Sequence, residues 1–323
     1  MEAVLAVGST STLLPSLLVG GMAIIFTLGL IAFFRGSVAI LRLTWAETIK
    51  ITSHPFLYVS IGILITATLL AAHFQPLLTG RKESEWSTFN SYQLFAYGAK
   101  FGAMVASYIL VSFSSLLFAG EFDRGTIKLL LTRPLLRREV FLSKVAISFA
   151  LSLFLYGVVL YVSYVYAVWR GDLGPVWDTH QYLIMRSEAS LQSDFWNTLP
   201  IAYLPLLTSC FLGILVSNLI DSSGFAVLIA FVIFLLLNFV STFLGESQQM
   251  NFFTYYRGDG FDILRAHSEG FGDTLGYGGK TPPKEWFAGK GLLLPLWVRV
   301  PLVSMAALIL PAWLVFRSKN IHA

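Results

Sequence analysis

The chain has 323 residues, of which 56% are hydrophobic and only 12% are charged. Soluble domains average about 25% charged residues, so this composition excludes a water-soluble globular enzyme. The balance of 22 Lys and Arg against 18 Asp and Glu is too even to indicate a nucleic-acid-binding protein. The single cysteine, Cys210, excludes a disulfide framework within the chain and any metal cluster built on several thiolates.

Seven long runs without a charged residue divide the sequence. A helix needs about 20 mostly apolar residues to cross the hydrocarbon core of a bilayer, and each run is long enough. The apolar/polar alternation of a transmembrane β-strand is missing from these runs. We therefore predict an all-α integral membrane protein with spans near residues 12–34, 56–74, 100–119, 142–168, 200–220, 224–244 and 296–316.

The charges between the spans predict the orientation in the membrane. One side receives residues 35–55, 120–144, Asp221 and the tail after 316, with 11 basic and 5 acidic residues. The segments on the other side are longer, and they contain 11 basic and 13 acidic residues. Because basic residues accumulate in cytoplasmic loops, the first side is predicted to be cytoplasmic and the N-terminus to lie outside.

The first span, within residues 1–35, is predicted to be an extra anchor helix. A signal peptide is the alternative, but the run is longer than a signal core and its start carries Glu2 without a basic residue. The six remaining spans form a transmembrane domain over residues 55–316, and residues 317–323 are a short cytoplasmic tail.

Residues 36–54 have a different pattern, because one half of the helical wheel is mostly apolar. Trp45 lies on the apolar half, whereas Arg42, Glu47 and Lys50 lie on the other. This pattern predicts an amphipathic helix in the cytoplasmic membrane interface, with its charged face toward the cytosol. The alternative is a plain cytoplasmic extension of a neighbouring span.

The cytoplasmic loop at 120–144 carries the strongest signal, because six of the eleven cytoplasmic basic residues fall within it. Gly125 can close a helix in the left-handed conformation, and Thr126 can cap the next turn. Pro134 suits the start of the helix that enters the membrane, where Lys144 is expected to extend its ammonium to the interface. The Leu-rich run between them predicts a short helix on the cytoplasmic face, a surface suited to docking a protein partner.

This loop resembles the signature loop of ATP-binding-cassette (ABC) permeases of the type-2 exporter class. The shared pattern is E-x-x-x-G-T, a Leu-rich run, R-P, a basic pair and a Lys at the next span. The matching residues are Glu121, Gly125, Thr126, Leu129, Leu130, Leu131, Arg133, Pro134, Arg137, Arg138 and Lys144. The interfacial helix, the six core spans and the long outer loop agree with the class over residues 36–316, whereas the first span is extra.

The resemblance implies that the loop, with Arg124 among its docking residues, binds a separate cytoplasmic ABC ATPase subunit. Two permease copies, identical or related, would assemble with two ATPase subunits in a prokaryotic inner membrane. ATP and Mg would bind those subunits, and their closure would rotate the membrane helices between inward-facing and outward-facing forms. This chain would bind no cofactor and catalyse no reaction. The simpler alternative is a basic turn that only obeys the charge rule.

Other candidate sites are weaker. Gly279-Lys280-Thr281 ends like a phosphate loop, but Thr274 stands where the motif requires glycine. The five histidines lack the spacing of a zinc site. The centres of the predicted spans contain no Asp, Glu, Lys or Arg, which disfavours an ATPase-independent secondary transporter.

Milder polar residues in the spans are candidates for a translocation path between two permease copies, although helix packing is the favoured interpretation. They are Ser112, Ser115, Asn238 and Thr242. The outer loop at 245–292 mixes glycine with aromatic residues, which predicts irregular but folded backbone, and residues 246–292 are a candidate site for an extracytoplasmic partner. A membrane scaffold that drives maturation of, or mechanical work on, such a partner is the alternative to export.

Overall fold

The computed structural model describes residues 38–78, 91–127, 136–171, 174–177, 184–241 and 296–319, together with positions 243, 261 and 264. The predicted extra helix at 1–35 lies outside the described residues, and so does the outer loop at 245–292 apart from positions 261 and 264.

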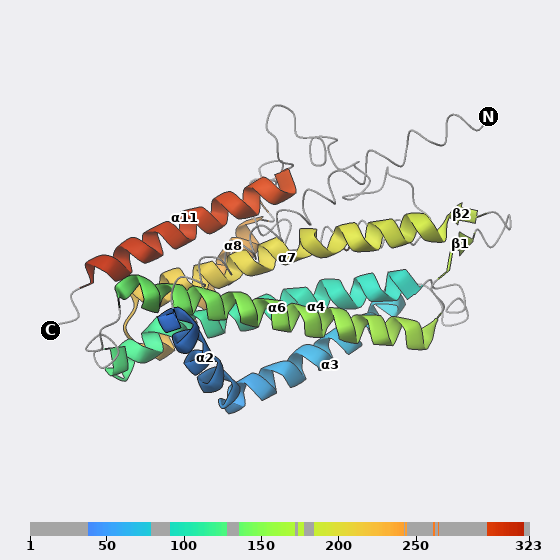
Figure 1. The fold of residues 1–323 in the computed structure, drawn as a ribbon. Helices are drawn as coiled ribbons and strands as arrows, with labels where there is room; N and C mark the ends of the chain where they lie inside the picture. The colour runs from blue at the N-terminus through green and yellow to red at the C-terminus, as the bar shows by residue number, and fades with distance from the viewer. Residues whose placement is uncertain are drawn as a thin grey trace.

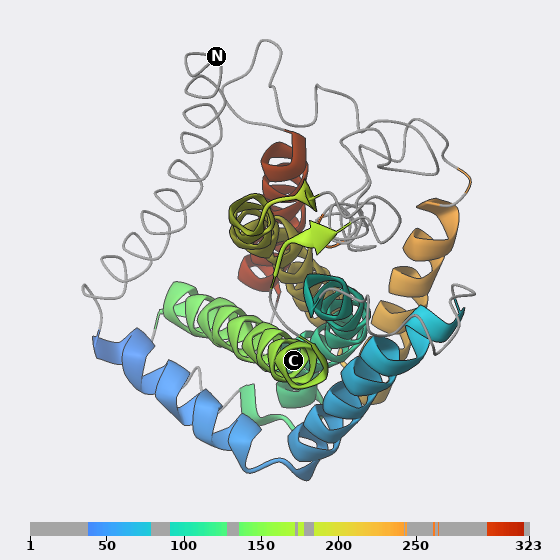
Figure 2. The ribbon, with the colours of Figure 1, turned by 90° about the vertical axis from the view of Figure 1, so that its right-hand side faces the viewer.

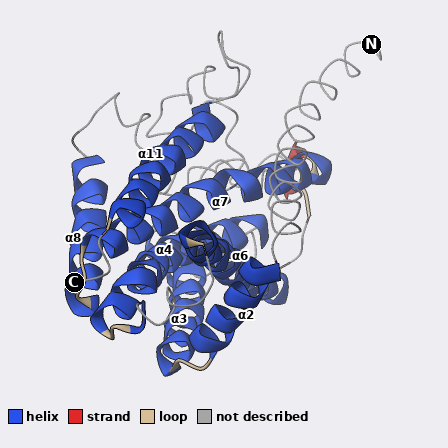
Figure 3. Ribbon diagram, turned by 60° about the vertical axis from the view of Figure 1, so that its left-hand side comes forward, coloured by secondary structure: helices blue, strands red, loops and turns tan. Residues whose placement is uncertain are grey.

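The described part of the chain contains seven helices and one small hairpin (Figure 1). The helices are α2 (Val38–Thr52), α3 (Pro55–Leu78), α4 (Ser91–Asp123), α6 (Arg137–Arg170), α7 (Glu188–Leu219), α8 (Ser223–Ser241) and α11 (Leu296–Ser318). Strands β1 (Val176–Trp177) and β2 (Ile184–Arg186) pair antiparallel, and the hairpin lies beside the start of α7 (Figure 3). All of these helices except α2 are long and apolar enough to cross a membrane, which confirms the all-α prediction for the six core spans.

Local signals explain where several helices begin. The Ser187 hydroxyl accepts a hydrogen bond from the Ser190 amide at 3.4 Å and so caps α7. The Glu139 carboxylate accepts one from the Leu136 amide at 3.0 Å, which satisfies a free amide before α6. Pro55 opens α3, a position where its missing N–H is harmless.

Helix α4 lies at the centre of the bundle. It packs against α3, α6, α7 and α8, and these four helices surround it when the structure is viewed along the long helices (Figure 2). The apolar stretches of α4 and α7 are the most buried of the six candidate spans, and that of α8 is the least buried. A displacement of one end of α4 is therefore expected to affect the four helices that pack against it.

Glycine brings the central helices close together. A Cβ atom at Gly102 of α4 would lie 2.7 Å from Val159 Cγ1 of α6 and 2.5 Å from Thr68 Oγ1 of α3. A Cβ atom at Gly213 of α7 would lie 2.7 Å from the Val111 carbonyl oxygen of α4. Small residues allow such backbone approach, on which helix association in a membrane depends.

Helix α2 crosses the long helices at one end of the bundle (Figures 1 and 2). A helix was predicted here, and α2 is present at the predicted place. Trp45 is 68% exposed, and its neighbours Leu41 and Ile49 are exposed as well. One expectation is wrong: Glu47 does not share an open face with Arg42, because its side chain is buried within the protein. The reason is a buried partner on another helix, described below.

Candidate functional site

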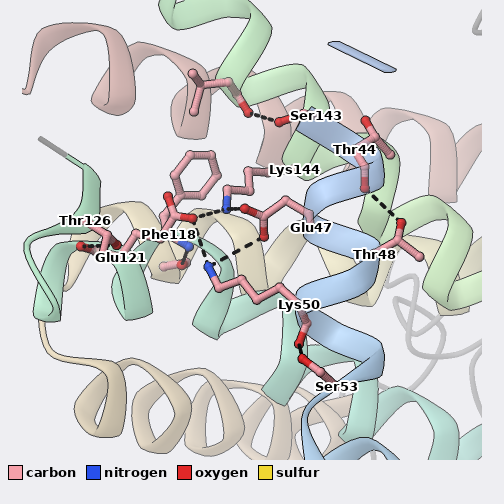
Figure 4. A network of polar contacts seen from close by, with 12 residues as sticks. Thr44, Glu47, Thr48, Lys50, Ser53, Phe118, Glu121, Thr126, Ser143 and Lys144 are labelled. Carbon is pink, nitrogen blue, oxygen red and sulfur yellow. Dashed lines mark hydrogen bonds and ion pairs between the residues drawn. The ribbon is translucent and has the colours of Figure 1, made fainter. Parts of the chain in front are cut away.

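Four charged side chains from three helices meet where α2 crosses the bundle (Figure 4). The Lys144 Nζ of α6 lies 2.8 Å from Glu47 Oε1 of α2 and 2.6 Å from Glu121 Oε1 of α4. The Lys50 Nζ of α2 lies 3.0 Å from the same Glu121 oxygen and 3.7 Å from Glu47 Oε2. We call Glu47, Lys50, Glu121 and Lys144 the charge cluster, and this end of the molecule the cytoplasmic end, after its predicted orientation.

Most of the charge cluster is buried. The side chains of Lys144 and Glu121 are 1% and 3% exposed, whereas that of Lys50 is 50% exposed. Lys144 therefore does not extend to the membrane interface as its position near a span end had suggested. Removing an ion from water costs several kcal/mol unless it is paired, and here two ammonium groups balance two carboxylates. The cluster is thus a closed junction with one exposed edge, at Lys50.

The chain leaves this junction through a tight turn. Gly125 has φ +67°, the left-handed conformation predicted for it, and its amide donates to the Phe122 carbonyl at 3.0 Å. The Thr126 hydroxyl donates to the Glu121 carbonyl at 3.4 Å and so bonds back to the end of α4, whereas the turn that it was predicted to cap runs into residues outside the described part of the chain. Ile127 is buried between α4, α6 and α7. The start of the loop is thereby fixed to the residues around Glu121.

The structure describes some of the remaining loop residues and leaves others outside the described part of the chain. Arg124 and Arg138 are exposed, on either side of the loop. Leu129, Leu130, Leu131, Arg133 and Pro134 lie outside the described residues, so the short docking helix stays a prediction.

Arg137 contacts the C-terminal end of the described chain. Its guanidinium donates to the carbonyl oxygens of Arg317 and Lys319 at 2.8 and 3.1 Å. The ammonium of Lys319 pairs with Asp221 and lies 3.9 Å from the centre of the Phe122 ring. These contacts join the start of α6 to the end of α11, the turn between α7 and α8, and the end of α4.

A further contact joins α4 to α8. The carboxylate of Asp123, the last residue of α4, accepts a hydrogen bond from the Ser223 hydroxyl at 2.5 Å. Together with the charge cluster and the Lys319 contacts, this bond means that polar side chains link α2, α4, α6, α8, α11 and the turn after α7 at the cytoplasmic end.

The candidate path residues bond to α4. The hydroxyls of Ser112 and Ser115 donate to the carbonyl oxygens of Tyr108 and Ser112 at 2.8 and 2.7 Å. The Asn238 amide of α8 donates to the Tyr108 hydroxyl at 3.1 Å. Thr242 lies outside the described residues. The two serine bonds lie within α4 and the Asn238 bond joins α8 to α4, so both the helix-packing interpretation and the translocation path stay predictions.

Sequence reasoning missed two members of the charge cluster, Glu47 and Lys50. A helical wheel separates charged from apolar positions, but it does not show which charge meets a partner. The available signal was a Glu and a Lys spaced i, i+3 on a helix preceding the loop.

The model of the family described as ABC-2 family transporter protein matches residues 80–260, which is more than half of the chain. The chain belongs to the ABC-2 transporter family. The matched region contains α4, α6, α7 and α8, and so includes Glu121 and Lys144, whereas α2 lies outside it.

Family membership confirms the resemblance found in the loop and identifies an ABC-2 permease, an integral membrane protein with several spans. No curated protein matches the chain. Among the residues that the structure describes in this permease, no group of three or more His, Cys, Asp or Glu side chains is placed to hold a metal ion.

Proposed function

We propose that this permease is the membrane subunit of an ATP-driven exporter, and that a separate cytoplasmic ABC ATPase docks on the loop at 120–144. The burial of Glu121 carries the proposal. This residue opens the family-like loop motif, and its carboxylate is held by Lys144 and Lys50 from two other helices. A loop anchored in this way can pass a displacement into the bundle, because packed interiors shift as units and do not deform continuously.

The surface around the turn suits such a partner. Arg124 and Thr126 are exposed at the end of α4, and Arg138 is exposed at the start of α6. Basic groups beside a Leu-rich segment offer both charge and apolar contact, the mixture found in protein interfaces. ATP and Mg bind the partner subunit in this scheme.

A second permease copy completes the proposed assembly in a prokaryotic inner membrane. Helix α8 is the least buried candidate span, and it exposes large apolar side chains such as Phe225, Phe231 and Phe239. These side chains suit contact with lipid or with another permease copy. Two copies would enclose the path of an unidentified substrate, with Asn238 near it.

The test compares two glycines. A Cβ at Gly125 or at Gly120, one turn earlier, meets no atom within 4 Å, and of the two only Gly125 has a positive φ. Gly125→Ala therefore strains the turn by about 1–2 kcal/mol without a clash, whereas Gly120→Ala leaves the helix intact. After purification of a tagged chain from native membranes, we expect Gly125→Ala to lower the recovery of ATPase and the ATP hydrolysis of the complex.

Equal recovery and equal hydrolysis in the two variants would contradict the docking role of this loop. The unsubstituted chain is informative in the same experiment. If no ATPase is recovered with it, a secondary transporter becomes the better explanation. If an extracytoplasmic protein is recovered together with the ATPase, mechanical work on that protein becomes preferable to export.

A further inference from the structure

We propose that Glu47 is a positioning residue which makes α2 a moving part of the coupling machinery. The proposal rests on the function proposed above, and it adds an element that lies outside the family match. In this scheme a displacement of the loop passes from Glu121 to Lys144 and then through Glu47 into α2.

The first support is the sharing of one ammonium group. Lys144 Nζ contacts carboxylate oxygens of α2 and α4 at 2.8 and 2.6 Å, and its side chain is 1% exposed (Figure 4). A buried ammonium needs nearby negative charge at every position that it occupies, because water is not there to replace a lost partner. A movement of Glu121 and Lys144 therefore draws Glu47 with it.

The second support is the burial of Glu47 within α2. Of residues 40–52, all of which are described, only Ile40 and Glu47 are buried. Leu43 and Ile51 are half-buried against the apolar cluster of the bundle, while Trp45 and Ile49 point away from the protein. In the second half of α2, Glu47 is thus the one buried side chain, and Ile51 and the contacts of Lys50 add to its hold on the bundle.

The third support is the tight junction between α2 and α3. Only Ser53 and His54 separate these helices, and hydrogen bonds run through both residues. The Ser53 amide donates to the Ile49 carbonyl at 2.9 Å, and the Leu57 amide donates to the His54 carbonyl at 3.1 Å. Such a junction has no slack, so a shift of α2 moves the start of α3, which runs along α4 toward the other end of the bundle (Figure 1).

The experiment measures whether α2 moves when the complex binds ATP. Ala46 is exposed and lies between Arg42 and Lys50 on the same face, so Ala46→Cys places a reactive thiol on α2. The natural thiol of Cys210 is fully buried and contributes little background. In the complex purified with its ATPase, we expect the rate of labelling by a water-soluble maleimide to differ severalfold between nucleotide-free protein and protein trapped with ATP and vanadate.

The decisive variant adds Glu47→Gln, which keeps the shape of the side chain and removes its charge. We expect this variant to retain the ATPase but to lose most of the nucleotide-dependent difference in labelling. Glu188→Gln is the matched control, because it makes the same change at an exposed position at the far end of α7. The control should label as the parent does.

The outcomes separate this proposal from the one on which it rests. Recovery of the ATPase with equal labelling in the presence and absence of nucleotide would overturn the role of α2 and leave ATPase docking intact. A full nucleotide-dependent difference in the Glu47→Gln variant would overturn the positioning role of Glu47. The Ala46→Cys measurement keeps Glu47 in place, so it decides the question even if Glu47→Gln is not recovered in folded form. Absence of the ATPase from the parent complex would contradict the proposed function itself.

Discussion

Different interactions hold the helices together at the two ends of the bundle. At the cytoplasmic end, ion pairs and charged hydrogen bonds link the helices, and the charge cluster is the most buried example. At the opposite end, α4 and α7 meet through aromatic rings, with Phe95 and Phe195 centred 4.8 Å apart. Ion pairs fix one geometry, whereas ring contacts tolerate several offsets. Under the proposed function, the cytoplasmic end would be a firm end that receives the displacement, and the opposite end an adaptable end that changes shape.

The adaptable end also contains a recess of about 130 Å³. Its lining is mainly aromatic and comes from α4, α6 and α7: Tyr92, Phe95, Tyr164, Ala167, Gln192, Phe195 and Trp196. Such space between rings leaves room for the helix ends to shift. The cytoplasmic end has less freedom, because a shift there separates charges.

Disrupting the charge cluster at the cytoplasmic end is expected to have the largest effect on stability. Lys144→Met removes the shared, buried ammonium and leaves Glu47 and Glu121 with the half-exposed Lys50 as their remaining partner in the charge cluster. Loss of one partner from a buried ion pair costs about 3–5 kcal/mol, so the free energy of unfolding in detergent should fall by that amount.

Lys50→Met is the control, since its side chain is half exposed and its ion pairs are screened by water. We expect it to cost less than about 1 kcal/mol. If both lysine variants unfold at the same denaturant concentration, the charge cluster does not hold the cytoplasmic end together.

The crossing of α4 and α7, between the two ends, should show an intermediate effect. Gly213→Ala places a Cβ 2.7 Å from the Val111 carbonyl oxygen, and the backbone cannot yield as a side chain would. Overpacking of this kind costs about 1–3 kcal/mol, measurable by chemical unfolding. Gly157→Ala is the control, because its Cβ meets no atom within 4 Å. A Gly213→Ala protein as stable as the Gly157→Ala protein would show that this crossing is loose.

The aromatic end should show the smallest effect. Phe95→Leu removes ring contacts to Phe195 and Phe261 while keeping an apolar side chain. An aromatic pair contributes about 0.5–1.5 kcal/mol beyond its buried area, and stability should fall by about that amount. Recovery of the ATPase with the permease should not change. A loss of ATPase in this variant would mean that the two ends are not independent.

The core spans could be predicted from the sequence because length and apolarity decide which segments cross a membrane. The left-handed turn at Gly125 was also visible, since it depends on a single residue type. The position of Glu47 was not, because its partner Lys144 is distant in the sequence and only the folded bundle brings them together. The crossing at Gly213 was missed for the same reason, as its tightness depends on the backbone at Val111.

The closed charge balance at the cytoplasmic end has a consequence for how this protein can change over generations. Replacing one buried member strands its partners, whereas replacing a whole buried ion pair by well-packed apolar residues is often neutral or stabilising. A substitution of one buried charge alone is therefore disfavoured, whereas the replacement of all the paired charges together is not. Glu47, Glu121 and Lys144 should for this reason be inherited as one unit, kept together or exchanged together.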